Sequence, residues 1–171
     1  MKRFVAAVAA LALPSLALAA AAAATAELKN GSGETVATAV FQPSSGGVEL
    51  TLRASKLPPG THGFHIHAVG KCEGPDFKTA GGHFNPTGKQ HGLENPLGPH
   101  AGDMPNLVVA ADGTASASVL LKSVTLGGGN ASLFHEGGTS LVIHAGPDDM
   151  KTDPAGNSGA RIACGVVERA R

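Results

Sequence analysis

Residues 35–52 read TVATAVFQPSSGGVELTL, a sequence that predicts two β-strands joined by a turn. Apolar residues recur at every second position on both sides, as expected for strands with one buried face. The segment between them, Pro43 to Gly47, consists of turn-forming residues. The residues that would share a face are Val36, Thr38 and Val40, then Ala37, Ala39 and Phe41 on the opposite face, and Val48, Leu50 and Leu52 in the second strand.

The same pattern continues outward, because short apolar runs alternate with turns along a 171-residue chain that contains 24 Gly and 11 Pro. We therefore expect an all-β domain of about seven or eight strands, either a Greek-key β-sandwich or a flattened, immunoglobulin-like eight-stranded barrel with two long loops. The remaining strands are expected at 27–30, 63–69, 107–110, 115–121, 141–144 and 160–167, and the long loops at 70–104 and 148–159.

The first 26 residues are typical of an export signal: two basic residues precede an apolar run that is broken at Pro14 and followed by small residues. The expected domain then covers residues 27–171. The apolar run is also long enough for an uncleaved membrane anchor, which the mass of the mature N-terminus would distinguish. Cleavage is expected near residue 19 or near residue 26, at Ala17-Leu18-Ala19 or Ala24-Thr25-Ala26.

Charge and composition give no reason to expect a nucleic-acid partner. The whole chain has 13 basic and 13 acidic residues, and the leader contains two of the basic ones, Lys2 and Arg3. Without the leader, 11 basic residues face 13 acidic ones, a formal charge of −2. There is no Trp, no Tyr and no basic stripe on which a nucleic acid would bind.

Two cysteines, Cys72 and Cys164, lie in the part that would be exported. An even number of cysteines in an oxidising compartment predicts one disulfide, and two buried free thiols are the alternative. The loop closed by such a bond would contribute about 4–5 kcal/mol through the entropy of the unfolded chain, before any strain is subtracted.

Histidine is the most informative residue type, with eight copies and none before His62. His65 and His67 are two apart in an expected strand, so both rings would leave the same face. Phe64 and Ile66 would then point into the core. Such a pair is also common on protein surfaces, so it predicts a metal site only together with further ligands.

The loop 70–104 supplies these further ligands in a region with few apolar residues. Imidazole and carboxylate groups are zinc ligands, and metal binding can order a loop that has little core of its own. A solvated, histidine-bearing loop would not explain such order. The candidates in this loop are His83, His91, His100 and Asp103.

Two residues after the apolar run 141–143 complete the candidate site. His144 ends that run, and Asp148 follows shortly afterwards. A carboxylate there could accept the spare ring N–H of metal-bound histidines and fix their tautomers. His62 has the opposite strand parity from His65, and His135 lies beside an expected turn at Glu136, so we expect neither to bind metal.

Five segments together resemble the signature sequences of copper,zinc superoxide dismutases, in the same order and over nearly the whole mature chain. The resemblance is to the exported, periplasmic bacterial branch of the family. The segments are GFHIH at 63–67, GHFNP at 82–86, HG at 91–92, HAGD at 100–103 and GARIACGV at 159–166.

The resemblance implies a role for each candidate residue. His83 would bridge the two metals as an imidazolate, the two cysteines would form the family disulfide, and Arg161 would be the active-site arginine that docks superoxide. The loop after His144 lacks the paired glutamates and following lysine of many eukaryotic relatives, so only Lys151 and Lys89 remain as candidates for further attraction. The implied copper ligands are His65, His67, His83 and His144, and the implied zinc ligands are His83, His91, His100 and Asp103.

The resemblance also implies an activity: disproportionation of superoxide to oxygen and hydrogen peroxide by alternating reduction and oxidation of a histidine-bound copper, with zinc holding the bridging histidine. Copper and zinc ions would be the cofactors, and the periplasm the location, with no stable membrane association once the signal is removed. The sequence leaves open whether the protein forms a homodimer. The alternatives are an exported copper and zinc buffer or chaperone, and a zinc hydrolase, which a filled zinc shell argues against.

Overall fold

A computed structural model describes residues 24–170, which form an all-β domain with one turn of 3-10 helix. The predicted leader lies outside the described residues, except for residues 24–26, which are part of the first strand. The strands are β1 (Ala24–Asn30), β2 (Thr35–Ser44), β3 (Gly47–Ala54), β4 (Gly60–His62), β5 (Phe64–His67), β6 (Leu107–Val109), β7 (Ala115–Leu121), β8 (Ser140–His144), β9 (Arg161–Val166) and β10 (Glu168–Arg169), and the helical turn is η1 (Lys78–Ala80).

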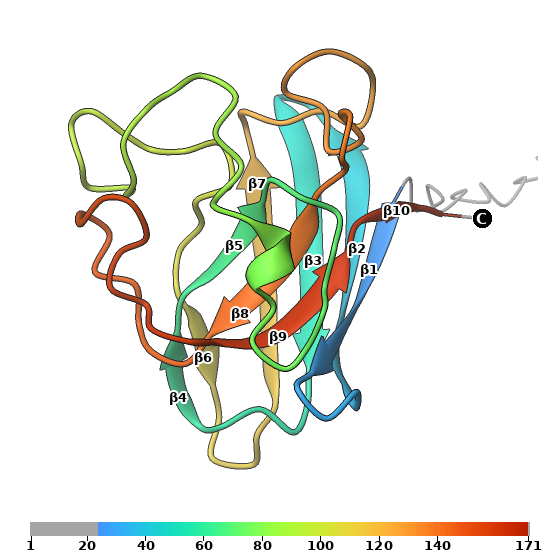
Figure 1. The fold of residues 1–171 in the computed structure, drawn as a ribbon, viewed down its shortest axis with the longest axis vertical. Helices are drawn as coiled ribbons and strands as arrows, with labels where there is room; N and C mark the ends of the chain where they lie inside the picture. Colours follow the sequence, from blue (N-terminus) through green and yellow to red (C-terminus); the bar gives the residue numbers. More distant parts are fainter. Residues whose placement is uncertain (1–23, 171) are drawn as a thin grey trace, which may run out of the picture.

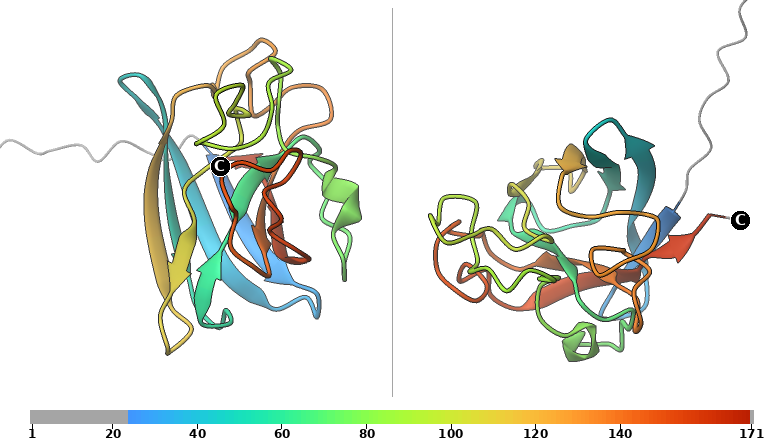
Figure 2. Two further views of the ribbon diagram at one scale, coloured as in Figure 1. Left: turned by 90° about the vertical axis from the view of Figure 1, so that its left-hand side faces the viewer. Right: turned by 90° about the horizontal axis from the view of Figure 1, so that it is seen from above.

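The strands form one curled antiparallel sheet in the order β5-β8-β9-β1-β2-β3-β7, with β10 beside β1 (Figure 1). The remaining pair, β4 and β6, forms a two-stranded ribbon. Because β4 leads directly into β5 and β6 contacts β7, this ribbon connects the two edges of the curled sheet. The result is the flattened barrel expected from the sequence, seen from two further sides in Figure 2.

The core lies inside this barrel and confirms the alternation predicted for residues 35–52. The row Ala37, Ala39 and Phe41 and the row Val48, Leu50 and Leu52 are both buried, and Phe41, Leu50 and Leu52 are 0% exposed. Val36 was expected on the opposite face and is nevertheless buried. The reason is a β-bulge: Leu28 pairs with Ala37 and Lys29 with Thr35, so the register skips Val36.

The predicted turn at Pro43 to Gly47 is shorter than expected. β2 continues through Pro43 and Ser44, which pair with Val48 and Gly47 of β3. Within residues 24–170, β1 pairs only as far as Phe41 and no strand pairs with Pro43 on its other side, a position in which proline is tolerated as in an edge strand.

The strand predicted at residues 63–69 is shorter than expected: β5 covers residues 64–67, and a separate short strand, β4, precedes it at residues 60–62. Gly63 lies between them; its N–H donates to Gly146 O, and its carbonyl accepts from His144 N. Strand β10, which was not predicted, pairs with the start of β1. These two differences account for ten observed strands where about eight were expected.

The disulfide between Cys72 and Cys164 is present, with 5.6 Å between the two Cα atoms. It joins the beginning of the long loop after β5 to the middle of β9, and it rules out the alternative of two free thiols. Within the described residues 24–170, no helix has the length and apolar character needed to cross a bilayer.

The two long loops, residues 68–106 and 145–160, lie side by side along one flank of the barrel (Figures 1 and 2). They are joined directly: the N–H of Glu94 donates to Met150 O at 3.0 Å, and Lys151 Nζ forms an ion pair with the Glu94 carboxylate at 2.9 Å. Gly92 packs so closely against Met150 that a Cβ atom there would lie 2.1 Å from Met150 O, which only glycine avoids.

Candidate metal centre

Seven side chains that the sequence singled out gather where the long loops cover strands β5 and β8. Each of the seven residues is at most 8% exposed. They form two groups of four in which the potential ligand atoms all lie within 4.8 Å of one another. The first group is His65, His67, His83 and His144, here called the four-histidine set, and the second is His83, His91, His100 and Asp103, here called the aspartate set.

Strand geometry explains how the four-histidine set comes together. Phe64 and Ile66 are fully buried in the core, so alternation directs His65 and His67 to the other face of β5, under the loops. Strand β8 pairs with β5, with Val142 opposite His65, and His144 follows a register shift at the end of β8. An isolated β-bridge places His83 opposite His67.

Hydrogen bonds leave one nitrogen free on each strand-borne ring. His67 Nδ1 donates to Gly81 O at 2.9 Å, and His144 Nδ1 donates to Gly159 O at 3.2 Å. The remaining Nε2 atoms of these two rings face each other at 3.4 Å. His65 Nδ1 and His83 Nε2 are buried without a hydrogen-bond partner. These four nitrogens are therefore available to a ligand at a shared point.

The aspartate set is arranged around one carboxylate oxygen. His83 Nδ1 and His91 Nδ1 lie 2.9 and 3.0 Å from Asp103 Oδ1, and His100 Nδ1 lies 3.4 Å from it. The other oxygen, Oδ2, accepts from the backbone N–H groups of Gly92 and His100, which fixes the carboxylate. Three imidazole nitrogens and one carboxylate oxygen are a donor set typical of four-coordinate zinc.

Asp148 lies between the two sets, in the position that the sequence suggested for it. Its Oδ2 accepts from His65 Nε2 at 2.7 Å, and its Oδ1 accepts from His91 Nε2 at 3.0 Å. One carboxylate therefore orients a ring of each set. Gly156 makes room for it, since a Cβ atom at that position would lie 1.9 Å from Asp148 Oδ1.

Asn106 is a contributor that the sequence analysis missed. Its Nδ2 donates to Asp148 O at 2.9 Å, and its Oδ1 accepts from Asp148 N at 2.8 Å. The only hint in the sequence is its place three residues after Asp103.

The electrostatics of the site keep three rings of the four-histidine set, those of His67, His83 and His144, neutral. Burial lowers the pKa of His83 to about 4 and that of His144 to about 3, and it holds the pKa of His67 well below its usual range. For His91, burial is outweighed by hydrogen bonds to Asp103 and Asp148, which raise its pKa to about 9. The pKa values of both carboxyls are below their usual range, because histidine N–H donors overcome the opposing effect of burial.

Arg161 begins β9 and lies next to the four-histidine set. Its two terminal nitrogens donate to Phe77 O at 2.7 Å and to Gly81 O at 2.5 Å, so two carbonyls of the loop 68–106 hold the guanidinium in place. Burial lowers the pKa of Arg161. The residue lines a hollow of about 330 Å³ together with His67, His83, His100, His144 and Pro154, among others.

The remaining candidates lie elsewhere. Lys151 is paired with Glu94, and neither it nor Lys89 lines the hollow beside Arg161. His62 Nδ1 donates to His144 O at 2.8 Å, and its Nε2 lies 2.9 Å from Pro58 O. His135 stacks on Phe84, with 5.1 Å between ring centroids.

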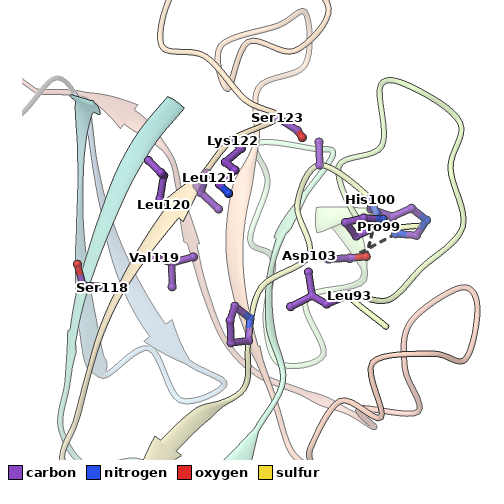
Figure 3. Close-up of a pocket in the computed structure, with 12 residues that line it drawn as sticks. Leu93, Pro99, His100, Asp103, Ser118, Val119, Leu120, Leu121, Lys122 and Ser123 are labelled. Atoms are coloured by element: carbon purple, nitrogen blue, oxygen red, sulfur yellow. Dashed lines mark hydrogen bonds and ion pairs between the residues drawn. The ribbon is translucent and has the colours of Figure 1, made fainter. Parts of the chain in front are cut away.

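A second hollow, of about 480 Å³, lies on the other side of the aspartate set (Figure 3). His100 and Asp103 form one of its walls, and Val119 and Leu121 of β7 form the other. Its lining is largely apolar. The hollow lined by Arg161 and by His67, His83 and His144 is therefore the better candidate for an anionic substrate.

Comparison with known proteins identifies the family to which the chain belongs. The family model "Copper/zinc superoxide dismutase (SODC)" matches residues 35–167. Superoxide dismutase [Cu-Zn] 1 of Aquifex aeolicus is 56% identical over 145 residues, which cover 84% of this chain and 86% of that protein. Superoxide dismutase [Cu-Zn] of Caulobacter vibrioides is 43% identical over 146 residues, 84% of each chain.

Solved structures show the same fold. A superoxide dismutase-like protein from Bacillus subtilis superposes with a TM-score of 0.80 at 41% identity, covering 83% of this chain and 96% of that one. The Cu/Zn superoxide dismutase from Brucella abortus gives a TM-score of 0.67 at 32% identity, covering 84% and 98%. The chain therefore belongs to the copper/zinc superoxide dismutase family, a family of oxidoreductases that bind copper and zinc and act on superoxide.

Proposed function

We propose that this chain disproportionates superoxide to oxygen and hydrogen peroxide in the periplasm, with copper in the four-histidine set and zinc in the aspartate set. The observation that carries this proposal is the position of His83, which belongs to both sets, with Nδ1 facing Asp103 and Nε2 buried without a hydrogen-bond partner. A single imidazole shared in this way makes the two sets one functional unit.

The donor atoms suit the two metals. His65 Nδ1, His83 Nε2 and His100 Nδ1 are buried and lack hydrogen-bond partners, which is costly in a protein interior unless a ligand occupies the site. Four imidazoles suit copper, and three imidazoles with a carboxylate suit zinc. The lowered pKa values of His83 and His144 keep these rings unprotonated at neutral pH, as metal ligation requires.

Copper, when bound, supplies the one-electron redox chemistry of the reaction, and zinc supplies a fixed positive charge. The protein supplies the proton-handling group: because His83 Nδ1 is directed at Asp103, Nε2 is the atom at which this ring can hold or release a proton. His83 lines the hollow beside Arg161, so a proton at Nε2 would be close to a bound substrate.

Arg161 is the proposed docking group for superoxide. Its guanidinium is a permanent, planar cation, and its two bonds to loop carbonyls fix its direction. The formal charge of the mature chain is −2, so net charge does not attract an anion. Attraction must come from a local positive field at the hollow, to which Arg161 contributes.

An exported copper and zinc buffer is the second candidate, because it would use the same ligands. Buffers that exchange metal readily use soft, accessible ligands such as Met or free Cys. Here both cysteines are paired and all seven candidate ligands are buried. A zinc hydrolase would need an open zinc position, whereas the aspartate set already provides four donors.

The test is direct measurement of superoxide consumption by protein loaded with both metals, with zinc alone, and after removal of copper by a chelator. We expect turnover only when copper is present. Stoichiometric binding of both metals without turnover would favour the buffer, and hydrolysis of ester substrates by the zinc form would favour the hydrolase.

Export remains part of the proposal, and we favour cleavage near residue 19. Ala24 and Ala26 are 0% and 3% exposed, and Ala24 pairs with both Phe41 and Arg169. Cleavage after residue 26 would remove these contacts from β1. Mass spectrometry of the mature protein from its host is expected to give an N-terminus at or before residue 24; a start at residue 27 would contradict this choice.

A further inference from the structure

In most candidate ligand rings, the nitrogen that does not face the set is hydrogen-bonded to an oxygen atom. The shared His83 uses one nitrogen in each set, and the other rings direct their second nitrogen at an oxygen atom. The partners are Asp148 for His65 and His91, Gly81 O for His67 and Gly159 O for His144. His100 is left, with its Nδ1 directed toward Asp103 and its Nε2 pointing away from the set.

The group that faces His100 Nε2 is the carboxylate of Asp153, with Oδ1 at 3.8 Å. This distance is longer than a hydrogen bond, so Asp153 acts on the ring through the negative charge of its carboxylate. The same oxygen accepts the backbone N–H of His91 at 2.6 Å. Asp153 thus reaches from the loop 145–160 to two members of the aspartate set, one through its ring and one through its main chain.

A carboxylate placed in this way can strengthen zinc binding. A metal-bound histidine that faces a carboxylate through its second nitrogen is a better donor and is held in one orientation. Asp148 serves His91 in this way but also serves His65 of the other set. Asp153 touches only the aspartate set, so its effect should be confined to zinc.

We propose that Asp153 is a positioning residue for zinc: it holds the backbone at His91 and supports the ring of His100 electrostatically. This inference rests on the proposed metal assignment and extends it by a residue that neither the sequence pattern nor the family resemblance indicated. Asp153 does not contact the four-histidine set, so it is not a catalytic residue.

The decisive variant is Asp153→Asn, which keeps an oxygen that can accept from His91 N–H and removes the charge that faces His100. Zinc affinity is measured by competition with a chromogenic chelator, on the disulfide-bonded full-length mature protein. We expect zinc binding to weaken about tenfold or more, with copper binding unchanged. Asp153→Ala, which also removes the bond to His91, should weaken zinc binding further.

A control separates this role from simple ordering of the loop. Asp149 lies in the same loop and caps it through bonds to the N–H groups of Lys151 and Thr152, without contact to the aspartate set. Asp149→Asn should leave zinc affinity as in wild type. The visible spectrum of cobalt(II) placed in the zinc site gives a second readout, which should change in Asp153→Asn and not in Asp149→Asn.

Two results would overturn the inference: wild-type zinc affinity in Asp153→Asn, or an equal loss in Asp149→Asn. Both are distinct from failure of the proposed function, which would show as a wild-type protein that binds no zinc or consumes no superoxide.

Discussion

The side-chain amide of Asn106 holds the main chain of Asp148 from both sides, donating to its carbonyl at 2.9 Å and accepting from its N–H at 2.8 Å. Because Asp148 in turn orients His65 and His91, Asn106 acts on both metal sets without contacting either. We expect Asn106→Ala to weaken both copper and zinc binding, by about tenfold, since supporting residues of this kind typically contribute 10–100-fold. Chelator competition for each metal measures this. If binding of only one metal weakened, Asn106 would not act on both sets through Asp148. Asn130→Ala, at an exposed position in another loop, is the control.

Arg161 should determine the rate and not the metal content. Arg161→Glu replaces a fixed cation by an anion beside the four-histidine set, so kcat/KM for superoxide should fall by at least about tenfold while bound copper and zinc stay the same. Arg161→Lys should recover part of the rate, because lysine keeps the charge and loses the fixed fork of donors. Lys151→Gln is the matched control, since Glu94 already offsets that charge. Equal rates in all four proteins would remove Arg161 from the mechanism.

Salt should slow the enzyme. The screening length is about 10 Å at 0.1 M ionic strength, so a local positive field at the hollow is weakened as salt is added. We expect kcat/KM to decrease steadily with ionic strength in wild type and to be much less sensitive in Arg161→Glu. A rate that is constant or increases with salt would contradict local attraction.

The metal-free protein should lose stability in mild acid. Histidines of the unfolded chain take up protons below about pH 6.5, whereas burial keeps His83 and His144 neutral in the folded state down to about pH 4 and about pH 3. The free energy of unfolding should therefore fall as the pH decreases from 6.5 toward 4. His91 acts in the opposite sense: its raised pKa gives stability that is complete below pH 6.5 and lost as the pH rises to about 9.

Urea unfolding in the presence of a chelator, repeated across this pH range, measures both effects. His144→Gln should make the acid-side slope shallower, because one of the rings that resist protonation is gone. A midpoint that does not change between pH 6.5 and 4.5 would contradict the burial argument.

The disulfide should matter for both stability and activity. Its two cysteines are 92 residues apart, so replacing both by serine should lower the free energy of unfolding by about 4–5 kcal/mol. The bond also anchors the loop whose carbonyls at Phe77 and Gly81 hold Arg161. We therefore expect kcat/KM of the fully metallated serine variant to fall as well. Thermal unfolding and stopped-flow kinetics test the two parts, and an unchanged rate would show that Arg161 is fixed without the disulfide.

Local patterns explain why much of the fold could be predicted from the sequence. Alternation identified which residues of β2 and β3 share a face, and the i, i+2 spacing of His65 and His67 placed both rings on one face of β5. Such relationships extend over a few neighbouring residues, where strand geometry is fixed. The grouping of the ligands was expected through family resemblance, and the structure brings the same residues together.

The parts that were missed depend on contacts between distant segments. Asn106 and Asp153 act through bonds to main-chain atoms that lie 42 and 62 residues away in the sequence. No periodicity or composition marks such a residue, because its role exists only after the two long loops have met. The β-bulge at Val36 was missed for a similar reason, because it depends on where the neighbouring strand β1 shifts register.

The direct joining of the two long loops has a consequence for protein engineering. Since Glu94 bonds to Met150 and pairs with Lys151, while Asp153 bonds to His91, each loop is shaped to the other. A chimera that takes only one of these loops from a relative would lose the contacts that join the two loops. Exchanging both loops together should preserve the metal centre, and lineages that lengthen one loop should show compensating changes in its neighbour.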